Sequence, residues 1–131
     1  MPKKPSAKYV DGYLLLVPKK KLPEYKKMAK DAAIIWKKYG ALNYKECVID
    51  DPNPMPEYLP LTFPKIMKPK PSEVVIFSYI EYKNKTHRDQ VNKKVMKEMD
   101  EMMKDDPDHM KNMPFDMKKM AFGGFKVIVS D

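Results

Sequence analysis

The chain is short of the residues that build covalent or metal-bound sites. It has one cysteine, Cys47, and two histidines among its 131 residues. A single cysteine excludes an internal disulfide and fits a reducing compartment, and so few sulfur and imidazole ligands, far apart, cannot form a structural zinc site. The composition therefore predicts a protein without a metal centre.

Long apolar runs and catalytic signature motifs are also missing. The longest apolar run, residues 13–17, is far too short to span a bilayer. The basic N-terminus, residues 1–8, has no apolar signal-peptide core and is expected to be flexible. No phosphate loop, nucleophile elbow or dinucleotide fingerprint occurs. We therefore expect a cytoplasmic protein that needs no cofactor and makes no membrane contact.

Arginine is nearly absent, although the chain is basic. The net charge is +8, but only one of the 26 basic residues is an arginine, Arg88. Clustered cations favour nucleic acids, yet bidentate recognition of guanine or phosphate favours arginine. The lysines are also interleaved with 18 acids, as Lys27 is with Glu24. This pattern predicts a solvated lysine-rich surface and no specific nucleic-acid binding.

The chain carries alternating strand and helix patterns that suit one domain, residues 1–131. Apolar side chains recur at helical spacing after Pro23, up to the stop at Gly40, and again after Thr86. The second helix should bury a stripe made of Val91, Val95, Met99 and Met102. These patterns predict strands at 9–17, 42–49, 73–82 and 120–129, and helices at 22–39 and 86–103.

Proline and glycine mark the irregular parts of the chain. Residues 52–72 contain seven prolines, and so many missing amide donors exclude a helix or a central strand there. We expect an extended surface loop. Gly123 and Gly124, inside the last strand, indicate a bulge or a close backbone approach.

The element order β-α-β-β-α-β predicts an α+β, ferredoxin-like sandwich, an antiparallel four-stranded sheet with two helices on one face. Yet the strands are apolar on both faces, and two helices can cover only one of them. The second face needs a partner, because large apolar patches are rarely left in water. We therefore predict a homodimer through a face made of Val75, Phe77, Tyr79, Phe125 and Val127.

Several ungapped stretches carry a family resemblance that covers nearly all of residues 9–129. They are "YVDGYLLLVPKKKLPEYKKMAKDAAIIWKKYGALNYKECVIDD", "TFPKIMKPKPSEVVIFSYIEY", "HRDQVNKKVM" and "MPFDMKKMAFGGF". They closely resemble the YbaA-like family of uncharacterised proteins. The resemblance implies a dimeric α/β barrel of the antibiotic-biosynthesis-monooxygenase-like superfamily, and it brings no established activity. The chain departs from the family at residues 53–61, which look longer than usual, and at Met117, where glycine is expected.

Residues 86–92, "THRDQVN", are the stretch that looks most like a site. Thr86 and Asp89 approximate a capping box, which explains them without a function. Arg88 and Asn92 lie beside the inner face of the helix, where polar groups need partners. Either Arg88 clamps a strand end or one of the acids at 50 and 51, or the pair faces a ligand. His87 is either exposed or a catalytic candidate.

The first strand offers one further candidate, Asp11, which alternates with apolar neighbours. A raised pKa would make its carboxylate a general base, whereas bonds to amides or to Arg88 would make it structural. Aromatic residues could line a flat pocket or could be plain core. We therefore predict a ligand site between the sheet and the helices, with His87 and Asp11 as its catalytic candidates. Its residues are Asp11, Trp36, Phe77, Tyr79, Arg88 and Asn92.

Two functions of different class follow from these patterns. In one, the protein is a dimer that binds a small molecule, either as a binding protein or as a cofactor-independent, monooxygenase-like enzyme. The family resemblance also includes a haem-degrading relative that uses Asn, Trp and His, near which this chain has Asp11, Phe77 or Tyr79, and His87. In the other, it is a non-catalytic dimeric module for protein interaction or stress response, with the proline-rich loop as its contact surface.

Overall fold

The computed structural model describes residues 6–109 and 111–131. Its core is one four-stranded sheet in the order β2-β3-β1-β4, and all three strand pairs are antiparallel. The predicted α+β class with an antiparallel sheet is confirmed. The strands are β1 (Tyr9–Pro18), β2 (Asn43–Val48), β3 (Glu73–Tyr82) and β4 (Ala121–Lys126), and the helices are α1 (Leu22–Lys38), α2 (Phe63–Met67) and α3 (Lys85–Met103).

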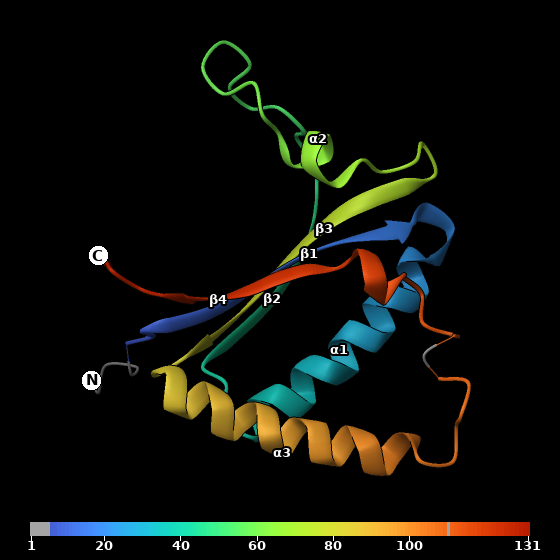
Figure 1. The fold of residues 1–131 in the computed structure, drawn as a ribbon, viewed down its shortest axis with the longest axis vertical. Coiled ribbons are helices and arrows are strands. Elements are labelled where there is room, and N and C mark those ends of the chain that lie inside the picture. Colours follow the sequence, from blue (N-terminus) through green and yellow to red (C-terminus); the bar gives the residue numbers. More distant parts are fainter. Residues whose placement is uncertain (1–5, 110) are drawn as a thin grey trace.

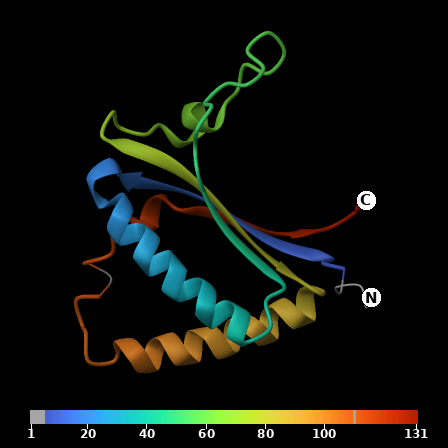
Figure 2. The ribbon, with the colours of Figure 1, turned by 180° about the vertical axis from the view of Figure 1, so that it is seen from behind.

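Helices α1 and α3 lie on the same face of the sheet (Figures 1 and 2). Helix α1 starts with proline in its first turn and stops before Gly40, whose φ of 112° favours glycine. Helix α3 is capped by Asn84, whose side chain accepts a hydrogen bond from the His87 amide. The predicted capping box at Thr86 and Asp89 is therefore wrong, because the helix begins one residue earlier.

The last strand is shorter than predicted, because β4 ends at Lys126 and residues 127–129 lie outside it. Its two glycines pair in unbroken register with β1, so the predicted bulge is wrong. The alternative, a close approach, is confirmed at Gly124. A Cβ atom there would lie 2.5 Å from the Tyr9 hydroxyl oxygen and 3.1 Å from Asp11 Oδ1.

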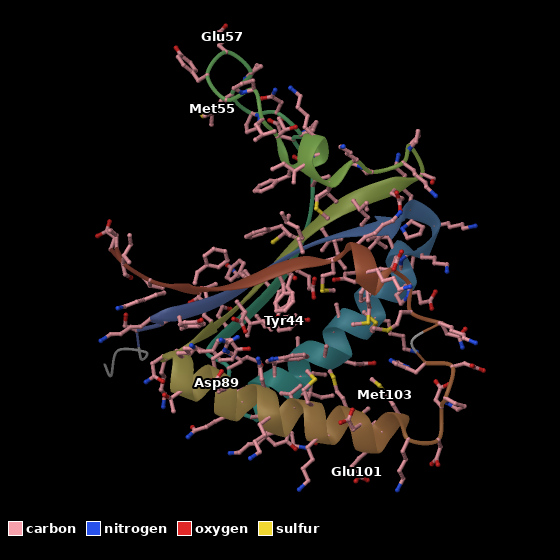
Figure 3. The ribbon with its side chains drawn as sticks, viewed as in Figure 1. Tyr44, Met55, Glu57, Asp89, Glu101 and Met103 are labelled. Atoms are coloured by element: carbon pink, nitrogen blue, oxygen red, sulfur yellow. The ribbon has the colours of Figure 1, made fainter. Side chains whose placement is uncertain are left out.

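The prediction that residues 52–72 exclude a helix is wrong, because this proline-rich segment contains the short helix α2. Helix α2 tolerates Pro64 because proline falls in its first turn, where no helical amide bond is lost. The Thr62 side chain caps it by accepting a hydrogen bond from the Lys65 amide. The segment before α2 projects away from the sheet, with Met55 and Glu57 at its tip (Figures 1 and 3).

Helix α2 contacts β1 and β3 on the face of the sheet opposite α1 and α3. Phe63 of α2 stacks on Phe77, and Val75 beside it is only 3% exposed. The expectation that this whole face is uncovered is therefore wrong at Val75. Phe77 and Phe125 stay open, at 42% and 61% exposure.

The core between the sheet and helices α1 and α3 consists of two separate clusters rather than one. Val91 and Val95 of α3 are buried as predicted, whereas Met102 faces the space between the sheet and the helices but is 64% exposed, so the stripe is not buried along its whole length. Tyr13 packs against both clusters. The buried residues of the first are Ile35, Ala41, Ile80, Tyr82, Val91 and Val95, and those of the second are Leu15, Val17, Tyr25, Ala29 and Ile76.

The prediction that residues 1–8 are flexible lies partly outside the part of the chain that the structure describes, which begins at residue 6. Within residues 6–8, the Lys8 backbone exchanges hydrogen bonds with Tyr82 and Val127. In the described part of the chain, no helix combines the length and the apolar character needed to cross a membrane.

Candidate ligand cavity

Asp11 and Arg88 form an ion pair at one end of the space between the sheet and the helices. Asp11 is 2% exposed, and its Oδ1 atom lies 3.2 Å from Arg88 Nη1. Arg88 Nη2 also donates to the Tyr9 hydroxyl, and the guanidinium carbon lies 5.0 Å from the centre of the Tyr9 ring. Burial raises the pKa of Asp11, although the Arg88 charge opposes that shift.

A second set of polar contacts adjoins this ion pair. Asn92 Oδ1 accepts hydrogen bonds from Trp36 Nε1 and from the Tyr82 hydroxyl, both at 3.1 Å. These groups have partners inside the protein, as buried polar groups require. The exception is Arg88 Nε, which is buried and makes no hydrogen bond, although it lies 2.9 Å from Asp89 Oδ1. We call these six residues the polar cluster: Tyr9, Asp11, Trp36, Tyr82, Arg88 and Asn92.

The structure places the remaining predicted site residues elsewhere. Phe77 and Tyr79 lie on the opposite face of the sheet, because their positions in β3 alternate with those of the buried Ile76 and Ile80. Of the acids considered as partners of Arg88, the structure selects Asp11 rather than the acids at 50 and 51.

His87 sits at the start of α3 in a structural contact. Its Nδ1 accepts a hydrogen bond from the Lys83 amide at 3.0 Å, and its ring meets the Tyr82 ring edge to face. Burial, followed by the nearby Lys83 charge, lowers the pKa of His87. This environment favours the neutral imidazole, which the hydrogen bond from Lys83 requires.

A cavity of about 400 Å³ lies between the two core clusters. It is bounded by the sheet, by α1, by the C-terminal part of α3, by His109 and by residues 111–120. Trp36 is the one member of the polar cluster that reaches it. Seven of the chain's 12 methionines line it: Met28, Met99, Met102, Met103, Met113, Met117 and Met120.

A carboxylate forms part of the cavity wall on the sheet side. Glu46 Oε1 accepts a hydrogen bond from the Tyr25 hydroxyl at 2.6 Å, and Oε2 accepts one from the Tyr44 hydroxyl at 2.7 Å. Burial, together with the Glu46 charge and hydrogen bonds, raises the pKa of both tyrosines. Both hydroxyls therefore remain donors to Glu46 at physiological pH.

Across the sheet, Glu46 pairs with Ser78, which pairs with Tyr13. All three side chains line the cavity. Burial, followed by the Asp11 charge, raises the pKa of Tyr13 to about 12. Among the described residues, no group of three or more His, Cys, Asp or Glu side chains is arranged to hold a metal ion.

The sequence analysis did not identify Glu46 as a candidate site residue, although the residue pattern of β2 indicates that its side chain points inward. Tyr44 and Glu46 are two residues apart in β2, so both point to the face that the helices cover. Figure 3 shows Tyr44 pointing from the sheet into the space beside α1. An acid at an inward position of a strand is costly without partners and therefore indicates a site or a hydrogen-bonded core group.

The comparisons with known proteins agree with the resemblance seen in the sequence. Residues 8–117 match the family described as "Protein of unknown function (DUF1428)". The "Uncharacterized protein YbaA" of Escherichia coli K12 is 40% identical over 129 residues, which cover 95% of this chain and 99% of that protein. The YbaA protein of Shigella flexneri matches equally well. Among solved structures, the de novo designed protein Foldit4 aligns over 94% of this chain and 99% of its own, at 10% identity and a TM-score of 0.41.

Proposed function

The chain belongs to the family of proteins of unknown function DUF1428, and from that premise we propose that it binds a small, largely apolar molecule in the cavity beside Glu46. One observation carries the proposal. The cavity lies where a domain of this size usually has a continuous core, and it is lined by residues of the first core cluster and by residues packed against the second. Its volume of about 400 Å³ falls within the range of ligand pockets.

The chemistry of the lining supports binding rather than catalysis. Methionine side chains adapt to ligands of different shape, and the few polar groups on the sheet side can orient one. The catalytic candidates are engaged elsewhere, because Asp11 is paired with Arg88 and His87 is bonded to the Lys83 amide. We therefore assign no reaction step to either residue.

A neutral solvatochromic dye such as Nile red tests the proposal. The dye should bind with a blue-shifted emission, and Ala32→Phe should weaken binding at least about tenfold, because Ala32 lines the cavity. The matched control is Ile34→Phe, on the same helix but 62% exposed. Equal binding by both variants would show that the dye binds elsewhere, and no binding by the wild type would refute the proposal.

We further propose that the subunit is ferredoxin-like and pairs as a dimeric α/β barrel related to the monooxygenase-like proteins. The strand order β2-β3-β1-β4 and the shared face of α1 and α3 support the fold. The open apolar side chains of Phe77 and Phe125 support the pairing. A stable interface of standard size buries about 800 Å² on each partner.

Two phenylalanines of β4 test the dimer, because they lie on opposite faces of the same strand. Phe125→Glu places a charge on the open face and should give a monomer in sedimentation at micromolar concentration. Phe122→Glu, at a position that is 73% exposed and paired with Tyr13 on the helix face, should leave the dimer intact. A monomeric wild type would refute the pairing.

The second candidate function is a protein-interaction module. It is favoured by the projecting segment before α2, whose Tyr58 and Leu61 side chains are 74% and 69% exposed. Replacing both with serine should abolish recruitment of a partner while dye binding persists. We place either function in a reducing compartment, because Cys47 is free and exposed.

A further inference from the structure

The cavity beside Glu46 carries a charge pattern opposite to that of the whole chain. Lysine and arginine supply 26 of the 131 residues, and the net charge is +8. Yet none of the described residues that line the cavity is a lysine or an arginine, whereas Glu46 and Asp31 both line it. The lining side chain that can become cationic is His109, and it lies 3.6 Å from Asp106.

Glu46 has donors but no positive partner among the described residues. Each carboxylate oxygen accepts one tyrosine hydroxyl, and each retains capacity for a further hydrogen bond. No ion pair to Glu46 is found within the described residues. Glu46 is half-buried beside a largely apolar cavity wall, and a cation bound in the cavity would supply the opposite charge that its carboxylate lacks.

Aromatic rings line the same cavity as Glu46. Tyr13, Trp36, Tyr44 and Phe115 all line the cavity, and the Trp36 and Tyr44 ring centres lie 6.0 Å apart. The negative face of an aromatic ring attracts organic cations, most strongly when water is excluded. Thioether walls accommodate the apolar body of such a molecule.

We infer that the cavity is specific for a hydrophobic cation, an organic molecule with an apolar body and a protonated amine or a delocalised positive charge. This inference rests on the proposed function and adds the ligand's charge to it. Glu46 supplies the opposite charge, the aromatic rings supply cation–π contacts, and the methionines supply the apolar wall. The hydroxyls of Ser78 and Tyr13, beside Glu46 in the same row of the sheet, are placed to orient polar substituents.

Two probes of nearly identical shape and opposite charge test the inference, tetraphenylphosphonium and tetraphenylborate. Calorimetry on the wild-type protein should show the cation binding about tenfold more tightly than the anion. The cation should also displace Nile red, which links it to the same cavity. The chain's net charge of +8 acts in the opposite direction, so nonspecific attraction would favour the anion.

The matched variants are Glu46→Gln and Glu81→Gln. The first keeps a side-chain oxygen for one tyrosine hydroxyl but removes the charge, and it should abolish the preference for the cation. The second removes a charge from β3 at a position that does not line the cavity, and it should leave the preference unchanged. The wild-type comparison needs no variant, so it remains decisive even if Glu46→Gln fails to fold.

The outcomes separate this inference from the proposed function. Equal binding of both probes, or tighter binding of the anion, would overturn the charge preference while leaving a ligand cavity in place. Failure of the cation, the anion and the neutral dye to bind would overturn both. A preference for the cation that survives in Glu46→Gln would overturn the role of Glu46.

Discussion

The two ends of the space between the sheet and helices α1 and α3 are built in opposite ways. At one end, the polar cluster fills the space with an ion pair and with hydrogen bonds between its own side chains. At the other end, methionines surround a cavity of about 400 Å³. The residues that look most reactive in the sequence therefore support the fold, and the residues that look inert form the candidate site.

The largest effect should come from breaking the ion pair in the polar cluster. Arg88→Met should lower the free energy of unfolding by about 3 kcal/mol at pH 7, because it leaves the buried Asp11 carboxylate without its partner. The loss should be smaller at pH 4. Burial raises the pKa of Asp11, so lower pH favours its protonated form in the folded protein, and stability falls as rising pH removes that proton.

A double variant distinguishes pairing from simple loss of packing. Asp11→Asn combined with Arg88→Met should recover at least about 1 kcal/mol of the loss in urea denaturation, because the unpaired charge is gone. No recovery would mean that Arg88 acts through its apolar stem rather than through its charge.

The next largest effect on stability should come from Gly124, whose backbone lies close to the Tyr9 side chain of the polar cluster. Gly124→Ala should cost about 2 kcal/mol, because the new Cβ would lie 2.5 Å from the Tyr9 hydroxyl oxygen. Gly123→Ala is the matched control, since its Cβ would lie 3.5 Å from the Phe125 ring, an ordinary contact. It should stay within about 0.5 kcal/mol of the wild type. Equal thermal shifts for the two variants would contradict the tight packing at Gly124.

A smaller difference should separate two alanines of α1. Ala29 is 5% exposed within the second core cluster, whereas Ala32 lines the cavity. Ala29→Leu should therefore cost about 1.5 kcal/mol through overpacking, while Ala32→Leu should be nearly neutral because the side chain has room. Urea denaturation checks the pair, and equal costs would mean that the cavity closes in solution.

The smallest effect should come from His87. Its lowered pKa means that the unfolded chain takes up the proton first, so stability should fall as pH drops below about 6.5. His87→Gln does not titrate and should lose less stability between pH 7.5 and 5.5, with a difference below about 1 kcal/mol. Parallel pH profiles for the two proteins would contradict this assignment.

The sequence predicted the elements whose patterns are strong and clearly ended. The structure has β1, α1 and β3 almost at the predicted boundaries, because Pro18 and Gly40 end apolar runs of clear period. Helix α2 was missed because the high proline content of residues 52–72 was taken to exclude any helix. A proline in the first turn is compatible with a helix, and Pro64 occupies that position in α2.

The candidate site was harder to predict because it depends on packing in three dimensions. Which acid pairs with Arg88 depends on the register of β1 against α3, which no local pattern encodes. The cavity exists because side chains from segments that are distant in the sequence leave a space between them. Its volume therefore cannot be predicted from the hydrophobic periodicity of the sequence. The alternation of Tyr44 and Glu46 in β2 did point to an inward carboxylate and could have been used.

The projecting segment before α2 separates two halves of the chain that together form one sheet. The first half contains β1 and β2, and the second contains β3 and β4. In the order β2-β3-β1-β4, every ladder joins a strand of one half to a strand of the other. During synthesis, β1 and β2 therefore have no neighbour in this sheet until β3 has left the ribosome. By the same arrangement, a chain cut in the projecting segment would be held together by all three ladders.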